Sequence, residues 1–136
     1  MNMGAYRMRI LGYLMAANAA LFFFGAAQHT GIEIGPFAEP RIIPAAIVES
    51  ICGIALIVGA LAALGGGAHA RLAALIGNLV AIAGVSLGMI ALAAGRGPRT
   101  ASNDLYHRIM LLLAAAALAL LFTRRRRAEL PSQSGT

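Results

Sequence analysis

Charged residues are scarce in this chain, and acidic residues are the scarcest. Only 12% of its 136 residues are charged and five are aspartate or glutamate, whereas 60% are hydrophobic. In an ordinary soluble domain about a quarter of the residues are charged. The composition therefore excludes a typical water-soluble enzyme, and it excludes a disordered chain, which combines low hydrophobicity with high charge. The length is that of one domain.

Lysine is absent and cysteine occurs once. All eleven basic residues are arginine, and they give the chain a net charge of +6. A nucleic-acid-binding surface would combine such charge with aromatic stacking residues. Here the arginines flank apolar runs and no aromatic platform accompanies them, so we exclude nucleic acid as a partner. The lone cysteine, Cys52, excludes an internal disulfide bond and any CxxC site.

Four long apolar runs make up most of the chain. A membrane-spanning helix needs about 20 mostly apolar residues. The runs are too long for barrel strands and lack their two-residue alternation. Because a backbone in lipid must satisfy its own hydrogen bonds, each run is predicted to be a helix. The predicted spans are residues 10–27, 42–64, 72–94 and 105–122.

The fold class that follows is an all-α integral membrane protein with four transmembrane helices in an antiparallel bundle, in contact with the lipid bilayer. Residues 1–127 are predicted to form a single transmembrane domain, and residues 128–136 a polar, disordered tail. A competing interpretation is that residues 1–27 are a cleaved signal peptide, because a basic start precedes an apolar run and small residues. That apolar run is longer than in a typical signal peptide.

The distribution of the arginines predicts the orientation. Seven lie on the side of the two termini and four on the other side. The positive-inside rule then places both termini in the cytoplasm, in what we expect to be a bacterial inner (plasma) membrane. The larger set is Arg7, Arg9, Arg71 and residues 124–127, and the smaller set is Arg41, Arg96, Arg99 and Arg108.

Proline and glycine mark the expected helix boundaries. Pro44 suits the first turn of the second span, where its missing N–H costs nothing. Gly95 and Gly97 are expected to end the third span. Ser102 or Asn103 is predicted to cap the fourth span.

Small residues recur at intervals of three and four along the third span, and they include Gly77, Gly84 and Gly88. In lipid, such a stripe lets two helix backbones approach closely. It is predicted to form the tightest contact of the bundle, either with another helix of the chain or with a second copy. Asn18 and Asn78 lie in mid-span and are predicted to make hydrogen bonds between helices.

Most ionisable residues gather at the predicted outer face of the membrane. Glu49 lies five residues past the proline that starts the second span, and therefore about 8 Å into that helix. A carboxylate that faces lipid at mid-bilayer costs about 2.5 kcal/mol or more. Glu49 is thus expected to face the bundle interior and to pair with Arg41, Arg108 or His107. Asp104 shares a helix face with His107 and Arg108.

Two interpretations of these polar residues stay open. They can form a binding pocket or an ion-pair network, or they can form a metal or acid–base site, because imidazole and carboxylate groups bind zinc, iron or copper and relay protons. Neither HExxH nor the paired ExxH of di-iron bundles is present. The first set is Glu49, Arg41, Asp104, His107 and Arg108, and the metal set is His29, Glu33, Glu49, Asp104 and His107.

Three functions are compatible with the sequence. The first is a small binding, transport or accessory protein with a polar pocket at the outer membrane face. The second is a membrane enzyme with a metal or acid–base site formed by His29, Glu49, Asp104 and His107. The third is a structural subunit of a larger membrane complex, and a chain this small also suits a homo-oligomer. No motif specifies a cofactor.

Overall fold

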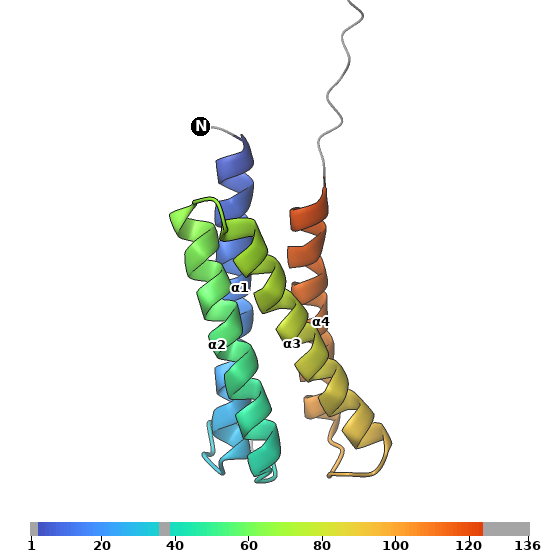
Figure 1. Ribbon diagram of the computed structural model, residues 1–136. Coiled ribbons are helices and arrows are strands. Elements are labelled where there is room, and N and C mark those ends of the chain that lie inside the picture. Colours follow the sequence, from blue (N-terminus) through green and yellow to red (C-terminus); the bar gives the residue numbers. More distant parts are fainter. Residues whose placement is uncertain (1–2, 36–38, 124–136) are drawn as a thin grey trace, which may run out of the picture.

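The computed structural model describes residues 3–35 and 39–123, which fold into four α-helices (Figure 1). All four are long and apolar enough to cross a membrane, which confirms the predicted all-α class. The predicted tail at residues 128–136 and the arginines at 124–127 lie outside the described residues. The helices are α1 (Met3–His29), α2 (Ile43–Gly65), α3 (Ala70–Ala93) and α4 (Ala101–Phe122).

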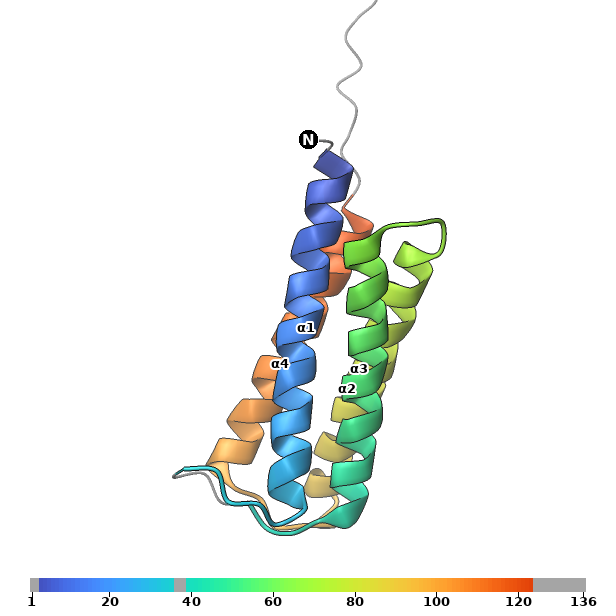
Figure 2. The same cartoon turned by 90° about the vertical axis from the view of Figure 1, so that its left-hand side faces the viewer.

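The helices form a bundle whose two ends differ. The start of α1, the α2–α3 turn and the end of α4 lie together at one end, and the α1–α2 and α3–α4 connections lie at the other (Figures 1 and 2). We call the second one the polar end; its connections are residues 30–42 and 94–100. Helix α2 packs closely against α1 and α3, whereas α4 contacts α1 and α3 more sparsely.

Large aliphatic side chains cover the exterior, whereas the interior combines many small residues with a few large ones such as Phe22 and Met15. On α2 the buried positions include Cys52, Leu56 and Ala60. A soluble bundle has the opposite arrangement, so this apolar exterior suits hydrocarbon and implies contact with the lipid bilayer. The exposed large hydrophobic residues on α2 are Ile43, Ile47, Ile51, Ile54, Val58, Leu61 and Leu64.

The glycines of α3 lie where other helices come close. A β-carbon at Gly77 would lie 2.6 Å from the Ala55 carbonyl oxygen of α2, and one at Gly84 would overlap the Cys52 sulfur. A β-carbon at Gly88 would lie 3.2 Å from Nε2 of His107 on α4. The small-residue stripe therefore brings α3 against α2 and α4 of the same chain.

The two mid-span amides have different partners. Asn18 donates from Nδ2 to the Met110 carbonyl oxygen at 3.3 Å, which joins α1 to α4. Asn78 donates to the Ala74 carbonyl oxygen of its own helix at 2.9 Å. The interhelical hydrogen bond expected of Asn78 is thus replaced by one within α3, because a side-chain amide can reach the carbonyl one turn before it.

Helix α1 begins at Met3, seven residues before the predicted span. Arg7 lies in this extension and donates to the Leu120 carbonyl oxygen and, at 2.7 Å, to the Thr123 hydroxyl. Arg71 donates to the Leu121 carbonyl oxygen at 2.7 Å. The last carbonyls of a helix have no partner within it, so these two arginines cap α4 and complement its negative end.

At the polar end, Thr100 caps α4 in place of the predicted Ser102 or Asn103. The helix starts at residue 101, and the Thr100 hydroxyl accepts from the Asn103 backbone N–H at 3.1 Å. Thr100 and Ser102 both donate to Glu39, with a shortest distance of 2.6 Å from Ser102. The α1–α2 connection is thereby tied to the start of α4, and a carboxylate sits at the positive end of that helix.

Candidate functional site

The polar end holds a buried pair of ionisable side chains, His29 and Glu49. Nε2 of His29 lies 3.7 Å from Oε1 of Glu49, and the two side chains are only 4% and 7% exposed. His29 is the last residue of α1, and its carbonyl oxygen accepts from the Ile42 N–H at 3.0 Å, which brings the start of α2 alongside. The predicted partners of Glu49 were Arg41, Arg108 and His107. The structure places His29 next to Glu49 instead.

The hydrogen bonds of His29 fix where its protons lie. Nδ1 is 3.2 Å from the Pro40 carbonyl oxygen, which can only accept, so Nδ1 carries a hydrogen. Nε2 of a neutral His29 is then an acceptor, and it faces a second acceptor on Glu49. A single proton, either on Nε2 as imidazolium or on the Glu49 carboxyl group, would relieve this contact between two acceptors.

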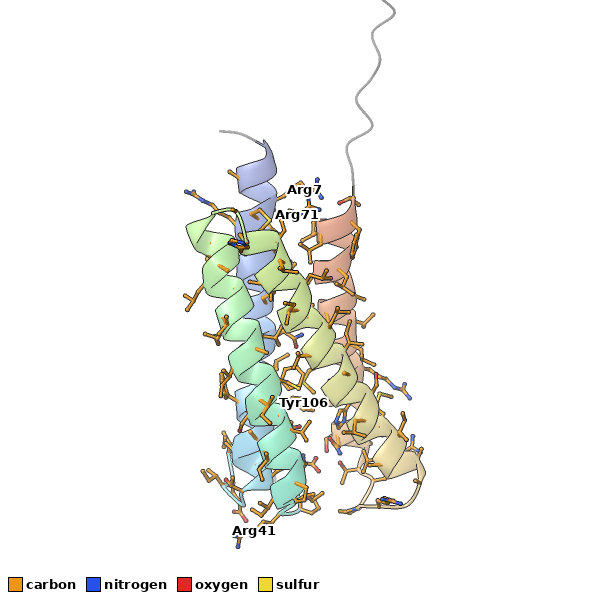
Figure 3. All side chains as sticks on the ribbon, viewed as in Figure 1. Arg7, Arg41, Arg71 and Tyr106 are labelled. Atoms are coloured by element: carbon orange, nitrogen blue, oxygen red, sulfur yellow. The ribbon has the colours of Figure 1, made fainter. Side chains whose placement is uncertain are left out.

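The other oxygen of Glu49, Oε2, is buried and accepts no hydrogen bond from any described residue. A β-carbon added at Gly25 would lie 2.9 Å from Oε2 of Glu49 and closer still to the Tyr106 hydroxyl. Tyr106 and Glu49 are therefore neighbours beside Gly25. Tyr106, which lies inside the bundle in Figure 3, donates its proton to the Leu21 carbonyl oxygen. Its hydroxyl therefore has no proton left for Glu49.

His107 of α4 is also buried and is held by its own helix. Its Nδ1 lies 2.8 Å from the Asn103 carbonyl oxygen, so this nitrogen donates. Nε2 is then the acceptor of a neutral ring, and it faces α3 at Gly88. Gly88 provides the room for the ring, since a larger residue there would press against Nε2.

A hollow of about 270 Å³ lies beside these side chains, between the polar-end halves of α2, α3 and α4. Its walls are mostly apolar and include Val48, Val85 and Leu92. A second hollow of about 180 Å³ lies between α1 and α4, and His29 and Asn103 line both hollows. The polar residues around the first hollow are His29, Glu49, Arg96, Asn103 and His107.

Four predicted site residues lie away from the buried pair. Asp104 pairs with Arg99 at 2.8 Å on the surface, and its carboxylate raises the pKa of the Arg99 guanidinium. Arg41 and Arg108 are exposed, and Figure 3 shows Arg41 at the opposite end of the bundle from Arg7 and Arg71. Glu33 is exposed too, because α1 ends at His29 and the chain turns at Gly31, whose φ is +97°.

The five residues of the predicted metal set therefore do not gather. Within residues 3–35 and 39–123, no group of three histidine, cysteine, aspartate or glutamate side chains is placed to hold a metal ion. Sequence reasoning missed Gly25, Asn103 and Tyr106. The spacing of four between Asn103 and His107 was an available signal, because residues four apart share a helix face.

No family model, curated protein or solved structure matches this chain. The chemistry of the site is thus the basis for a functional assignment. It combines apolar walls, a buried imidazole–carboxylate pair and two acceptors without a donor from the described part of the chain. This arrangement can bind a molecule that donates hydrogen bonds, and it can exchange a proton as it does so.

Proposed function

We propose that this protein binds a small molecule in the hollow at the polar end, as a binding, transport or accessory protein of the plasma membrane. The observation that carries the proposal is the hollow itself, in which Glu49, His29 and His107 converge between apolar walls. Ligand pockets are commonly concave and mostly apolar, with a few convergent polar groups. The volume lies just below the range of about 300–1,000 Å³ that holds drug-sized molecules, which favours a small ligand.

The proposal includes an orientation. The helices are taken as an antiparallel transmembrane bundle with both termini in the cytoplasm, and the polar end then lies at the outer membrane face. The support is the excess of arginine near the termini and the α2–α3 turn, where Arg7 and Arg71 also cap α4.

Cysteine labelling tests this orientation. In a Cys52→Ala background, Ile32→Cys of the polar end and Ala68→Cys of the α2–α3 turn each place one thiol at an exposed position. A membrane-impermeant maleimide added to intact cells is expected to label the first and not the second, and to label both after lysis. The unmodified chain is the control, because Cys52 is buried. Labelling of only Ala68→Cys in intact cells would reverse the orientation.

A filled pocket tests the binding function while the ligand is still unidentified. Ala91 lines the hollow, so Ala91→Phe is expected to occupy it, whereas Ala93→Phe places the same ring at an exposed position two residues on. Small molecules are extracted from each purified protein and compared by mass spectrometry. At least one species is expected with the unmodified chain and with Ala93→Phe, and it should be depleted at least about tenfold from Ala91→Phe, which corresponds to about 1.4 kcal/mol of lost affinity. Identical extracts would contradict the proposal.

An acid–base enzyme is the second candidate, and the shared proton of His29 and Glu49 favours it. Asp104 has no part in this version, because it is paired with Arg99. General acid–base catalysis needs a titratable group within reach of the reacting atom. A chemically altered molecule in the extracts of the unmodified chain, absent from those of Glu49→Gln, would favour the enzyme over the binding protein.

A further inference from the structure

We propose that the molecule in this hollow is a protonated amine, and that it binds in exchange for the proton shared by His29 and Glu49. The inference rests on the proposed function, since it names the ligand class of the same hollow. It is drawn from the hydrogen-bonding capacity of the site and from its charge balance.

Two acceptors around the hollow have no donor from a described residue, and the Asn103 amide lies beside them. Oε2 of Glu49 is buried without a donor from any described residue. Nε2 of His107 is the free acceptor of its ring, because Nδ1 donates to the Asn103 carbonyl oxygen. A buried acceptor without a partner is costly, and a ligand that donates hydrogen bonds removes that cost. An ammonium group has three donors and no acceptor, so it can supply the donor that such an atom lacks.

Charge balance explains why the amine replaces a proton. With its shared proton, the His29–Glu49 pair is neutral overall. If an ammonium group binds beside the Glu49 carboxylate and the proton leaves His29, the site stays neutral. Retention of that proton would leave a net positive charge in an apolar, mostly dehydrated site, which is strongly unfavourable. Binding of one amine should therefore release one proton.

The same balance predicts the opposite behaviour for an anion. A bound carboxylate would keep the site neutral only if the pair gained a second proton, so its affinity would rise as the pH falls. An anion would also leave the Glu49 and His107 acceptors without donors. The cation close to the hollow is Arg96, which is exposed, so water and salt screen its charge.

Few other titratable groups face the pair. Helix α3 contributes none near the polar end, because its titratable residue is Arg71, which lies at the other end beside α4's last turn. Glu39 is held by Thr100 and Ser102. The groups around the pair are Cys52 of α2, Tyr106 and His107 of α4, Arg96 after α3, and Glu39 and Arg41 of the α1–α2 connection.

Three ring compounds of similar size test the inference on the full-length protein in detergent. Benzylammonium, benzyl alcohol and benzoate are titrated by calorimetry between about pH 6 and 8, and benzylammonium affinity is expected to fall by about tenfold for each unit of decrease in pH, as the linkage of one proton requires. Glu49→Gln should weaken benzylammonium binding by at least about tenfold and benzyl alcohol binding by less, because only the ammonium group loses a charged partner worth more than about 1.4 kcal/mol. Glu49→Asp, which retains the charge, should recover part of the affinity. The pH dependence of the unmodified chain supports or opposes the inference even if a variant fails to fold.

Each other outcome has a defined meaning. Tighter binding of benzoate at low pH would make the ligand an anion and overturn the inference, and the binding pocket would stand. Equal affinities for benzyl alcohol and benzylammonium, without pH dependence, would also overturn it and leave the pocket. If Ala91→Phe binds all three compounds as the unmodified chain does, the hollow is not a binding site, and the proposed function fails together with the inference.

Discussion

At a pH where Glu49 is ionised, His29→Ala is expected to destabilise the bundle by about 3–5 kcal/mol, the range for breaking a buried ion pair by removal of one partner. The substitution leaves Glu49 buried, with Oε1 deprived of His29 and Oε2 already without a donor from the described residues. Its cost should be smaller at acidic pH, because a protonated carboxyl group carries no charge that needs a partner. The measurement is equilibrium unfolding of the detergent-solubilised protein by sodium dodecyl sulfate at two pH values.

Removal of both partners provides the control for this prediction. The double variant His29→Ala and Glu49→Gln has no charge to leave unpaired, so it should be more stable than His29→Ala alone. The difference between the double loss and the sum of the single losses is the coupling energy of the pair. Additive losses would show that His29 and Glu49 do not interact, and the shared proton on which the amine hypothesis depends would then have no basis.

The helices could be predicted from sequence because the bilayer imposes one simple rule on them. A long apolar run must be a helix in lipid, whatever packs against it. That rule could not predict where α1 starts, because it applies only to apolar runs. Arg7 and its neighbours precede the apolar run, and their helical structure has another cause. They reach the end of α4, and the partner of Arg7 lies more than a hundred residues away in the sequence.

The candidate site could be predicted only in part. The depth of Glu49 predicted a buried carboxylate with a partner, and the structure gives it one. The choice of His29 depends on where α1 ends and how it is rotated against α2, and the apolar pattern specifies neither. Gly31 is the local reason that Glu33 lies away from the candidate site, since the positive φ of Gly31 turns the chain away after His29. Asp104 lies on the surface and pairs with Arg99, five residues away, rather than with the buried residues.

The close contact between α2 and α3 leads to the second large effect. Gly77→Ala is expected to destabilise the protein by about 3 kcal/mol, at the upper end of the usual cost of overpacking. The new β-carbon would lie 2.6 Å from the Ala55 carbonyl oxygen. Backbone cannot rotate away as a side chain can, so the two helices must separate. Separation would also weaken contacts further along α3, where Gly84 fits against the Cys52 sulfur.

Gly65→Ala is the matched control for this prediction. Gly65 is helical, and no described atom lies within 4 Å of a β-carbon added there. Alanine should be neutral or slightly stabilising at such a position, since it lowers the entropy of the unfolded chain. Unfolding by sodium dodecyl sulfate, followed by circular dichroism, compares the two variants with the unmodified chain. If both variants behave alike, the contact at Gly77 is not tight, and the hollow beside α3 loses the rigid wall that a defined binding site needs.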